Sequence, residues 1–404
     1  MPPGSLFFPW QSNMSNNSKE IALFNVLLVL TVYGILGDIA YRENSLLVAF
    51  VMKKFDPALL LAGLLACALN LAMLLFFTLV VSPPYHYFPY NSKIRLLNDL
   101  IGVFFICGVP PYLAHFYCGH WPFLQKLAWM MLTGVVSLKF ISLIMANREL
   151  EAEVLTNGIG RGMGLYVNSA LKAEVPLSGV TFGGREWILD TVPWPQNLKT
   201  KELLLFLFSP SLSFCPNVPR FKSISVVYLM ERAVLFITFA GIGVTLHEGF
   251  LSPIWEKTTT STTFYSYLEL FSGAAVPCTL VCCILYFLVF ECVCNFFAEL
   301  TYQADRQFSG EWFAVTSYEE FSRQWNFPVG DALHSHVYTP FTRLTGGKMS
   351  SMVATYLVSI GIHELFMWGA MGRNFKWPWL TIFSLMQIPL LPLMCVITSL
   401  HPRP

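Results

Sequence analysis

The chain has 404 residues, of which 55% are hydrophobic and only 12% are charged, and its net charge is +1. Soluble domains carry about 25% charged residues, so this composition excludes a water-soluble globular fold and favours a protein whose solvent is the lipid bilayer. Because the net charge is close to zero, we do not expect the protein to bind nucleic acid or a strongly anionic surface.

Apolar runs with few charges recur along the chain, and each is close to the roughly 20 residues that a helix needs to cross a bilayer. They predict an all-α fold, a polytopic transmembrane helical bundle of about eight spans. The spans are expected at residues 21–37, 58–82, 97–118, 121–146, 224–247, 264–298, 350–371 and 376–399. The sixth is long enough to tilt or bend.

Two connections are long and hydrophilic, at residues 147–223 and 300–349. Counting spans from the N-terminus places both of them on the same side of the membrane as residues 1–20. The second long loop is richer in basic residues than the facing loop 248–263, and basic residues accumulate on the cytosolic side. We therefore expect a cytosolic segment at 1–20, and a single membrane-embedded domain at 21–404 whose long loops face the cytosol.

The chain has ten cysteines, and six of them lie inside the predicted spans. A cysteine in an apolar helix packs as a small hydrophobic residue, so we expect reduced thiols.

An ionisable pair, His363 and Glu364, stands inside the seventh span, in TYLVSIGIHELFMWGAM. Ionisable groups are costly at this depth and mark functional sites by default. A neutral histidine accepts a proton at physiological pH, which makes His363 a candidate general base. A histidine that bonds a neighbouring helix for structure is the competing interpretation, and both stay open. The H-E-x-x-H motif of zinc proteases is excluded, because Met367 stands where the second His is needed.

The second long loop mixes aromatic and polar residues, in FSGEW and in SYEEFSRQWNFPVGDALHSHVY. This composition suits the membrane interface, so an interfacial amphipathic helix is one interpretation. Asn326 stands out because an amide beside a tryptophan can supply an oxyanion contact. His334 and His336 form an H-x-H pair without a Cys or carboxylate at ligand spacing, so no metal is expected.

At these residues the sequence resembles the sterol O-acyltransferase and diacylglycerol O-acyltransferase branch of the membrane-bound O-acyltransferase (MBOAT) family, and it looks most like the fungal-type sterol enzymes. The resemblance is close from Asn295 to Leu400, in the order and spacing of NFFAELTYQADRQFSGEW, QWNFPV, HSHVY, HELFMW and QIPL. It is looser from about residue 130. There, SLKFISL at 137–143 and FLFSPSLSFCPNVPR at 206–220 resemble the branch's Lys-containing helix end and its F-x-F-x-P-[ST]-L stretch.

The resemblance implies a multi-pass protein of the endoplasmic reticulum membrane, with a tunnel for acyl-CoA from the cytosol and a lateral opening for an apolar alcohol. It implies that His363 is the catalytic base and that Asn326 assists it. It further implies a homo-oligomer, with acyl-CoA as a co-substrate and no other cofactor.

The resemblance also assigns substrate-binding positions. Three residues match the family's F-Y-x-D-W-W-N element: Phe308, Glu311 and Trp312. Others match positions around the acyl-CoA entrance or adjoin the base: Arg323, Trp325, Tyr338, Lys348 and Glu364. Arg323 and Lys348 are the charges that CoA phosphates need, although ordinary positive-inside charge explains them equally.

The chain departs from the family pattern at two places. Several positions of the F-Y-x-D-W-W-N element are replaced within residues 308–314, and Gly330 stands where the family has a histidine. Three hypotheses follow. The first is an acyl-CoA-dependent O-acyltransferase that esterifies a sterol 3-hydroxyl to form steryl esters. The second is a diacylglycerol O-acyltransferase that makes triacylglycerol, and the third is a non-catalytic lipid-binding or regulatory relative.

Overall fold

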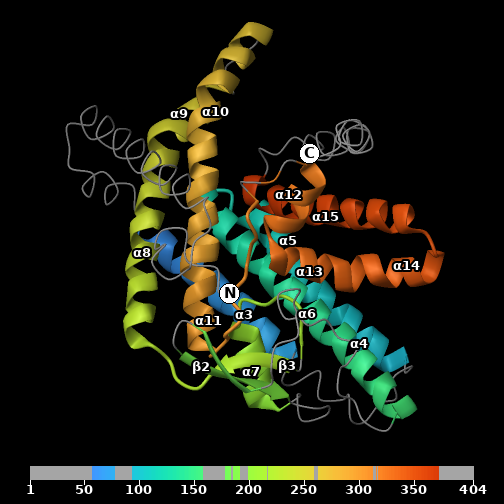
Figure 1. The fold of residues 1–404 in the computed structure, drawn as a ribbon. Coiled ribbons are helices and arrows are strands. Elements are labelled where there is room, and N and C mark those ends of the chain that lie inside the picture. Colours follow the sequence, from blue (N-terminus) through green and yellow to red (C-terminus); the bar gives the residue numbers. More distant parts are fainter. Residues whose placement is uncertain are drawn as a thin grey trace, which may run out of the picture. The chain divides into compact units, whose positions relative to one another are not determined.

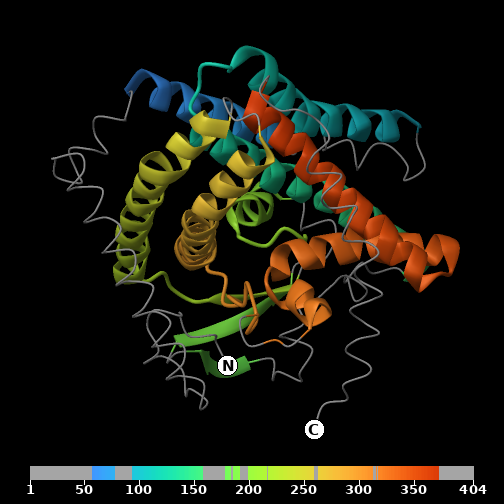
Figure 2. The same ribbon diagram turned by 90° about the horizontal axis from the view of Figure 1, so that it is seen from above.

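The computed structural model describes residues 57–77, 93–157, 178–182, 185–191, 199–215, 217–258, 263–312, 315 and 317–372. These residues are helical apart from three short strands and the connecting turns (Figures 1 and 2). They divide into two compact units. Unit 1 comprises described segments within Ser178–Ile188 and Arg220–Arg306, and unit 2 comprises the others.

Five helical stretches are long and apolar enough to cross a bilayer, at Lys93–Tyr117, Phe123–Ala152, Val226–Ile254, Ser272–Leu300 and Lys348–Met371. They confirm the third to seventh predicted spans and the multi-pass helical fold. The second predicted span contains a shorter apolar helix, Leu61–Phe76. The first and the eighth predicted spans lie outside the described residues.

Unit 2 holds the candidate site residues. Its elements are α3 (Pro57–Phe76), α4 (Lys93–Val103), the π-helical turn η4 (Phe104–Gly108), α5 (Val109–Tyr117), α6 (Phe123–Asn157), α7 (Thr200–Phe208), α12 (Tyr318–Gln324), α13 (Phe327–Leu333), the π-helical turn η9 (His334–Tyr338), α14 (Thr339–Thr345) and α15 (Lys348–Met371). Helix α15 packs against α5, α6, η9 and α14.

Helix α6 continues about three turns beyond the end predicted at residue 146. The reason is a pair of ionic contacts with α4. Arg148 binds Asp99 at 2.6 Å, and Arg95 binds Glu151 with both side chains largely buried. The hydropathy pattern predicted that the span ends where the charged residues begin. In the structure α6 continues past this point, because the charged side chains are paired with residues of α4.

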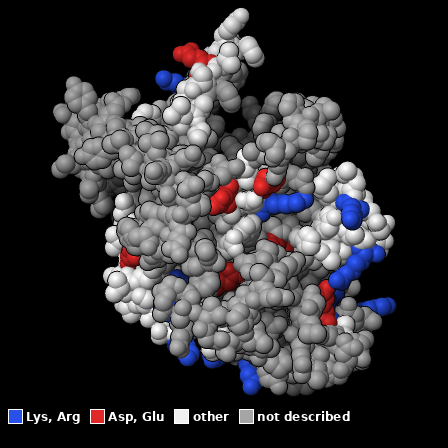
Figure 3. Space-filling model, in the orientation of Figure 1, with Lys and Arg blue, Asp and Glu red and all other residues white. Residues whose placement is uncertain are grey.

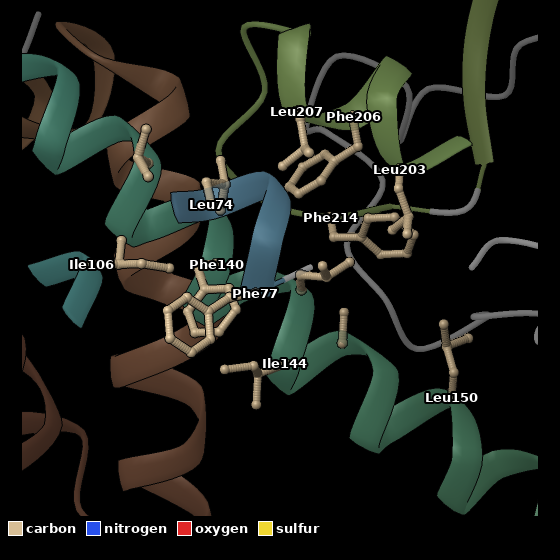
Figure 4. Packing of buried hydrophobic residues seen from close by; sticks show 13 residues of the cluster. Leu74, Phe77, Ile106, Phe140, Ile144, Leu150, Leu203, Phe206, Leu207 and Phe214 are labelled. Atoms are coloured by element: carbon tan, nitrogen blue, oxygen red, sulfur yellow. The ribbon is translucent and has the colours of Figure 1, made fainter. Parts of the chain in front are cut away.

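The main apolar core of unit 2 lies between α3, α6 and α7, with η4 contributing one side chain (Figure 4). Phe140 of α6 contacts Phe77 at the end of α3, and Phe206 of α7 contacts Phe214 edge to face. This core anchors α6, the helix on which α15 packs.

A buried lysine joins α6 to the segment that follows α7. Lys139 is 2% exposed, and its Nζ donates to the backbone carbonyls of Phe206, Ser209 and Ser211 at 2.8, 2.7 and 2.6 Å. The Lys-containing stretch 137–143 and the stretch 206–220 are therefore in direct contact.

Unit 1 is built around two long helical stretches. Its elements are α8 (Val226–Leu246), the π-helical turn η7 (His247–Leu251), α9 (Ser252–Thr258), α10 (Phe264–Phe287), the π-helical turn η8 (Leu288–Cys294), α11 (Asn295–Leu300) and most of a three-stranded sheet in the order β1 (Ser178–Phe182), β2 (Arg185–Thr191) and β3 (Asn217–Phe221). The sixth predicted span is interrupted: α10 contains Pro277, and η8 separates it from α11. Proline removes a backbone donor, and such features are where helices kink.

The strands were not predicted, and their position depends on long-range ion pairs. The carboxylate of Glu299 is fully buried and binds Arg185 of β2 at 2.9 Å, Arg306, and the backbone N–H of Ser225, which caps α8. Arg185 also lies over the ring of Phe221 in β3. These partners are far apart in sequence, so no local pattern reveals them.

Candidate functional site

His363 lies in the second half of α15, and one ring nitrogen is committed to its own helix. Its Nδ1 is 2.7 Å from the carbonyl oxygen of Ser359. A carbonyl only accepts, so Nδ1 carries the proton and Nε2 keeps its lone pair. Among the described residues Nε2 has no hydrogen-bond partner, and the side chain is exposed. The ring is therefore oriented as a base that an incoming hydroxyl can reach.

Glu364 follows His363 but is buried, with 7% of the residue exposed. Neither carboxylate oxygen has a hydrogen-bond partner within the described part of the chain. An unpaired buried carboxylate is costly, and a ligand hydroxyl that donates to it would reduce the cost. The location is consistent with the predicted substrate contact, which stays a prediction.

Asn326 begins helix α13 as its N-cap residue. Its Oδ1 accepts a hydrogen bond from the backbone N–H of Val329 at 3.2 Å, and its own carbonyl oxygen accepts from Gly330 at 3.0 Å. This capping bond fixes the amide so that Nδ2 points away from the helix end. No hydrogen bond joins Asn326 to His363 among the described residues. The predicted assisting role stays a prediction, and the structure adds a capping role.

Backbone hydrogen bonds hold the 308–312 segment against the turn that contains Asn326. The N–H of Phe327 donates to the carbonyl of Phe308 at 2.9 Å, and the N–H of Gly310 donates to Gln324 at 2.7 Å. A Cβ on Gly310 would lie 2.9 Å from the Gln324 side chain. Glycine at position 310 therefore permits this close approach, so the altered element still packs beside Asn326.

Aromatic side chains line helix α12 next to this turn. Trp312 meets Phe321 edge to face at 6.1 Å, and Phe321 stacks on Trp325 at 6.4 Å. Phe308 is buried, whereas Trp325 and Glu311 are exposed. The structure thus brings Trp312 and Trp325 into contact with one phenylalanine, Phe321, and it keeps Glu311 on the surface.

The π-helical turn η9 continues α13 and packs against α15. Tyr338 stacks on His334 at 5.1 Å. His336 lies between them in sequence, and burial lowers its pKa to about 4, so its ring is neutral at physiological pH. The sequence suggested His336 only as a metal ligand and did not reveal it as a partly buried neutral side chain, because burial is not visible in an H-x-H pattern.

The predicted CoA-binding charges lie on the outside of unit 2. Arg323 on α12 and Lys348 at the start of α15 are both exposed. Basic side chains are visible over the α14 and α15 region in Figure 3. Lys348 also begins a long helix, whose N-terminal N–H groups favour anions. Helices α14 and α15 run back along each other after Gly346, with the hydroxyls of Thr342 and Ser351 2.8 Å apart (Figure 2).

Comparison with known proteins shows which family this region resembles. Residues 198–392 match the model of the membrane-bound O-acyltransferase family, MBOAT. Probable sterol O-acyltransferase 2 of Schizosaccharomyces pombe is 31% identical over 185 residues, which are 43% of this chain and 39% of the relative. Diacylglycerol O-acyltransferase 1C of Glycine max is 26% identical over 277 residues, 66% of this chain and 49% of the relative. Sterol O-acyltransferase 2 of Candida albicans is 29% identical over 207 residues, 50% of this chain and 34% of the relative.

The aligned residues span less than half the length of each of these three relatives. The matched region nevertheless contains His363, Glu364, Asn326 and the 308–312 segment. Over residues 198–392, this chain is therefore similar to the membrane-bound O-acyltransferase family.

Proposed function

We propose that this protein transfers an acyl group from acyl-CoA to the 3-hydroxyl of a sterol, in the endoplasmic reticulum membrane. The observation that carries the proposal is the tautomer of His363, whose Nε2 is left open in a membrane-spanning helix. A secondary hydroxyl is a weak nucleophile unless a base removes its proton during the attack. Nε2 accepts that proton, the hydroxyl oxygen attacks the thioester carbon, and the CoA thiolate leaves and takes up a proton.

The other site residues support the same reaction. The two N–H groups of the Asn326 amide suit the oxyanion that develops on the thioester carbon. Exposed Arg323 and Lys348 suit the phosphates of CoA. The acceptor is proposed to be a sterol, because relatives named as sterol O-acyltransferases align with this chain at 28–31% identity.

The proposal is tested by supplying labelled oleoyl-CoA to microsomes from a host that lacks its own sterol and diacylglycerol esterifying enzymes. The expected product is a labelled steryl ester. Labelled triacylglycerol would contradict the sterol assignment and favour diacylglycerol as acceptor. Absence of both products from correctly inserted protein would favour the non-catalytic lipid-binding role.

Diacylglycerol is the second candidate acceptor, and the extent of the alignments favours it. The soybean diacylglycerol enzyme aligns over 66% of this chain, compared with 43% for the fission yeast sterol enzyme. The upstream part of the chain therefore has counterparts in diacylglycerol enzymes that the sterol alignment does not reach. Equal supply of both acceptors in the microsomal assay discriminates between them directly.

Asn326→Asp and Asn326→Ala separate the capping role from the proposed catalytic one. Aspartate caps a helix as well as asparagine but has no N–H donor. If Asn326 assists the reaction, Asn326→Asp keeps the melting temperature and lowers turnover by about 10²- to 10³-fold, as for loss of an oxyanion donor. Asn326→Ala is expected to lose about 1 kcal/mol of stability in addition. Full turnover in Asn326→Asp would show that Asn326 only caps helix α13 and does not assist the reaction.

Lys348→Ala is expected to raise the KM for acyl-CoA and leave kcat unchanged, because a phosphate contact binds ground state and transition state equally. The exposed position predicts an increase of only about two- to fivefold. The increase should shrink at high salt, since exposed charges are screened. Lys201→Ala, which removes an exposed charge from α7, serves as the control. An equal change in KM in both variants would show that Lys348 does not bind acyl-CoA.

A further inference from the structure

A buried cation lies where α5 and α15 end and α6 begins. Lys126 is 5% exposed, and its Nζ is 3.3 Å from the point that a Cβ on Gly372 would occupy. The carbonyl oxygen of His115 is 3.6 Å from the same point. Yet the ammonium makes no hydrogen bond or ion pair with any described residue. Burying an ammonium is costly unless it is paired and hydrogen-bonded, and the described residues supply no counterion to this largely buried side chain.

A second unsatisfied donor lies one helical turn further along α6. Trp129 is 5% exposed, and its Nε1–H has no acceptor in the described part of the chain. Residues three apart on a helix are neighbours on its surface, which places Trp129 beside Lys126. An ammonium and an indole N–H can only donate, so their common complement is a group that only accepts.

The surrounding residues do not supply that group. The Cys118 thiol is close enough for the charge of Lys126 to lower its pKa, but burial has the larger effect and the pKa is raised, so the thiol is neutral. Glu364, on the same helix as Gly372, makes no hydrogen bond among the described residues. The chain that continues from Gly372 contains no Asp or Glu up to residue 404.

Aromatic side chains pack at the ends of the helices that meet near Lys126. Trp121 lies 5.7 Å from Trp129, and the ring of His115 stacks on Trp368 at 4.0 Å. Tryptophans are enriched at the depth of the lipid headgroups. The turn that leads into α6 is exposed at Gly119 and His120, so this end of the bundle is open to the membrane interface.

We propose that Lys126 and Trp129 bind the phosphate of an anionic phospholipid at the end of unit 2 where α5 and α15 terminate. The ammonium and the indole N–H donate to phosphate oxygens, and the nearby aromatic rings contact the part of the lipid next to its headgroup. The site is separate from His363, and its occupancy does not depend on the proposed acyl transfer.

The test uses the full chain, purified in a neutral detergent, with phosphatidylglycerol as the probe. Retained lipid is counted by native mass spectrometry, and the melting temperature is measured with and without lipid. We expect phosphatidylglycerol to remain bound and to raise the melting temperature. In Lys126→Met the apparent affinity should fall about tenfold or more, the loss of one charge-assisted hydrogen bond. Trp129→Phe, which removes only the N–H, should give a smaller loss, and exposed Lys201→Met should give none.

The comparison ligands decide the source of the phosphate. If inorganic phosphate raises the melting temperature of the wild type as much as the lipid does, the site binds free phosphate and the proposal is overturned. Equal binding of phosphatidylcholine, or lipid binding unchanged in both Lys126→Met and Trp129→Phe, would also overturn it. If Lys126→Met does not yield folded protein, Trp129→Phe decides the question, and lipid binding unchanged in Trp129→Phe then overturns the proposal.

Discussion

His363→Ala is expected to abolish detectable acyl transfer while the protein still inserts in the membrane. A positioned general base contributes about 10²- to 10⁴-fold to a rate. His363 is exposed, and among the described residues its only hydrogen bond is to Ser359 of its own helix, so removing the ring breaks no hydrogen bond between the described helices. The measurement is ester formation per mole of purified protein, together with the melting temperature.

The control for this variant is His120→Ala, which removes an exposed histidine from a turn outside the spans. Its activity should equal that of the wild type. His363→Gln adds a stringent comparison, because glutamine is polar and similar in length but cannot act as a base. Substantial ester formation by His363→Gln would show that the imidazole is not the base. A large drop in the melting temperature of His363→Ala would favour the structural interpretation of this histidine instead.

Hydropathy predicted the third to seventh spans correctly because the requirement for about 20 apolar residues leaves a direct trace in the sequence. It placed the end of α6 too early, since the charges of Arg148 and Glu151 read as solvent-exposed. Their partners lie on α4, about 50 residues earlier in the chain, and only the fold brings them together. The strands of unit 1 were missed for the same reason, as the Arg185–Glu299 contact is not local.

The part of the candidate site that could be predicted is the part whose residues are unusual in a membrane helix. His363 and Glu364 stand out because ionisable residues inside a span are rare. The opposite environments of the two side chains, one exposed and one buried, were not predictable, since they depend on which face of α15 packs against its neighbours. The cap at Asn326 had a local signal that the sequence analysis did not use: asparagine two residues before a proline is typical of a helix start.

The altered 308–314 element shows how a departure from a family pattern can be accommodated. Its backbone still pairs with residues 324 and 327, and Gly310 fits against Gln324 where a Cβ would be too close. Residues 313 and 314 lie outside the described part of the chain. The described part of the element, residues 308–312, therefore keeps its position next to Asn326, which argues against interpreting the replacements as a loss of the site.

Lys139→Met is expected to cause the largest loss of stability of any substitution considered. The ammonium has three N–H groups, and three backbone carbonyls converge on it within 2.8 Å. Methionine matches the length of the side chain but removes one hydrogen-bond donor from each of the three carbonyls. Each buried acceptor left unsatisfied costs about 1–3 kcal/mol. The expected result is a markedly lower melting temperature and a poor yield of monodisperse protein, with exposed Lys201→Met unchanged.

Lys139→Arg tests whether charge or geometry is required at this position. A guanidinium keeps the positive charge but presents its donors in a flat fork, which does not match three carbonyls that converge on one nitrogen. We therefore expect Lys139→Arg to be destabilised as well, and wild-type stability in this variant would show that charge alone suffices. The two stretches at 137–143 and 206–220 are the two sides of this contact. The contact holds the segment around α7 on α6, the helix against which α15 packs.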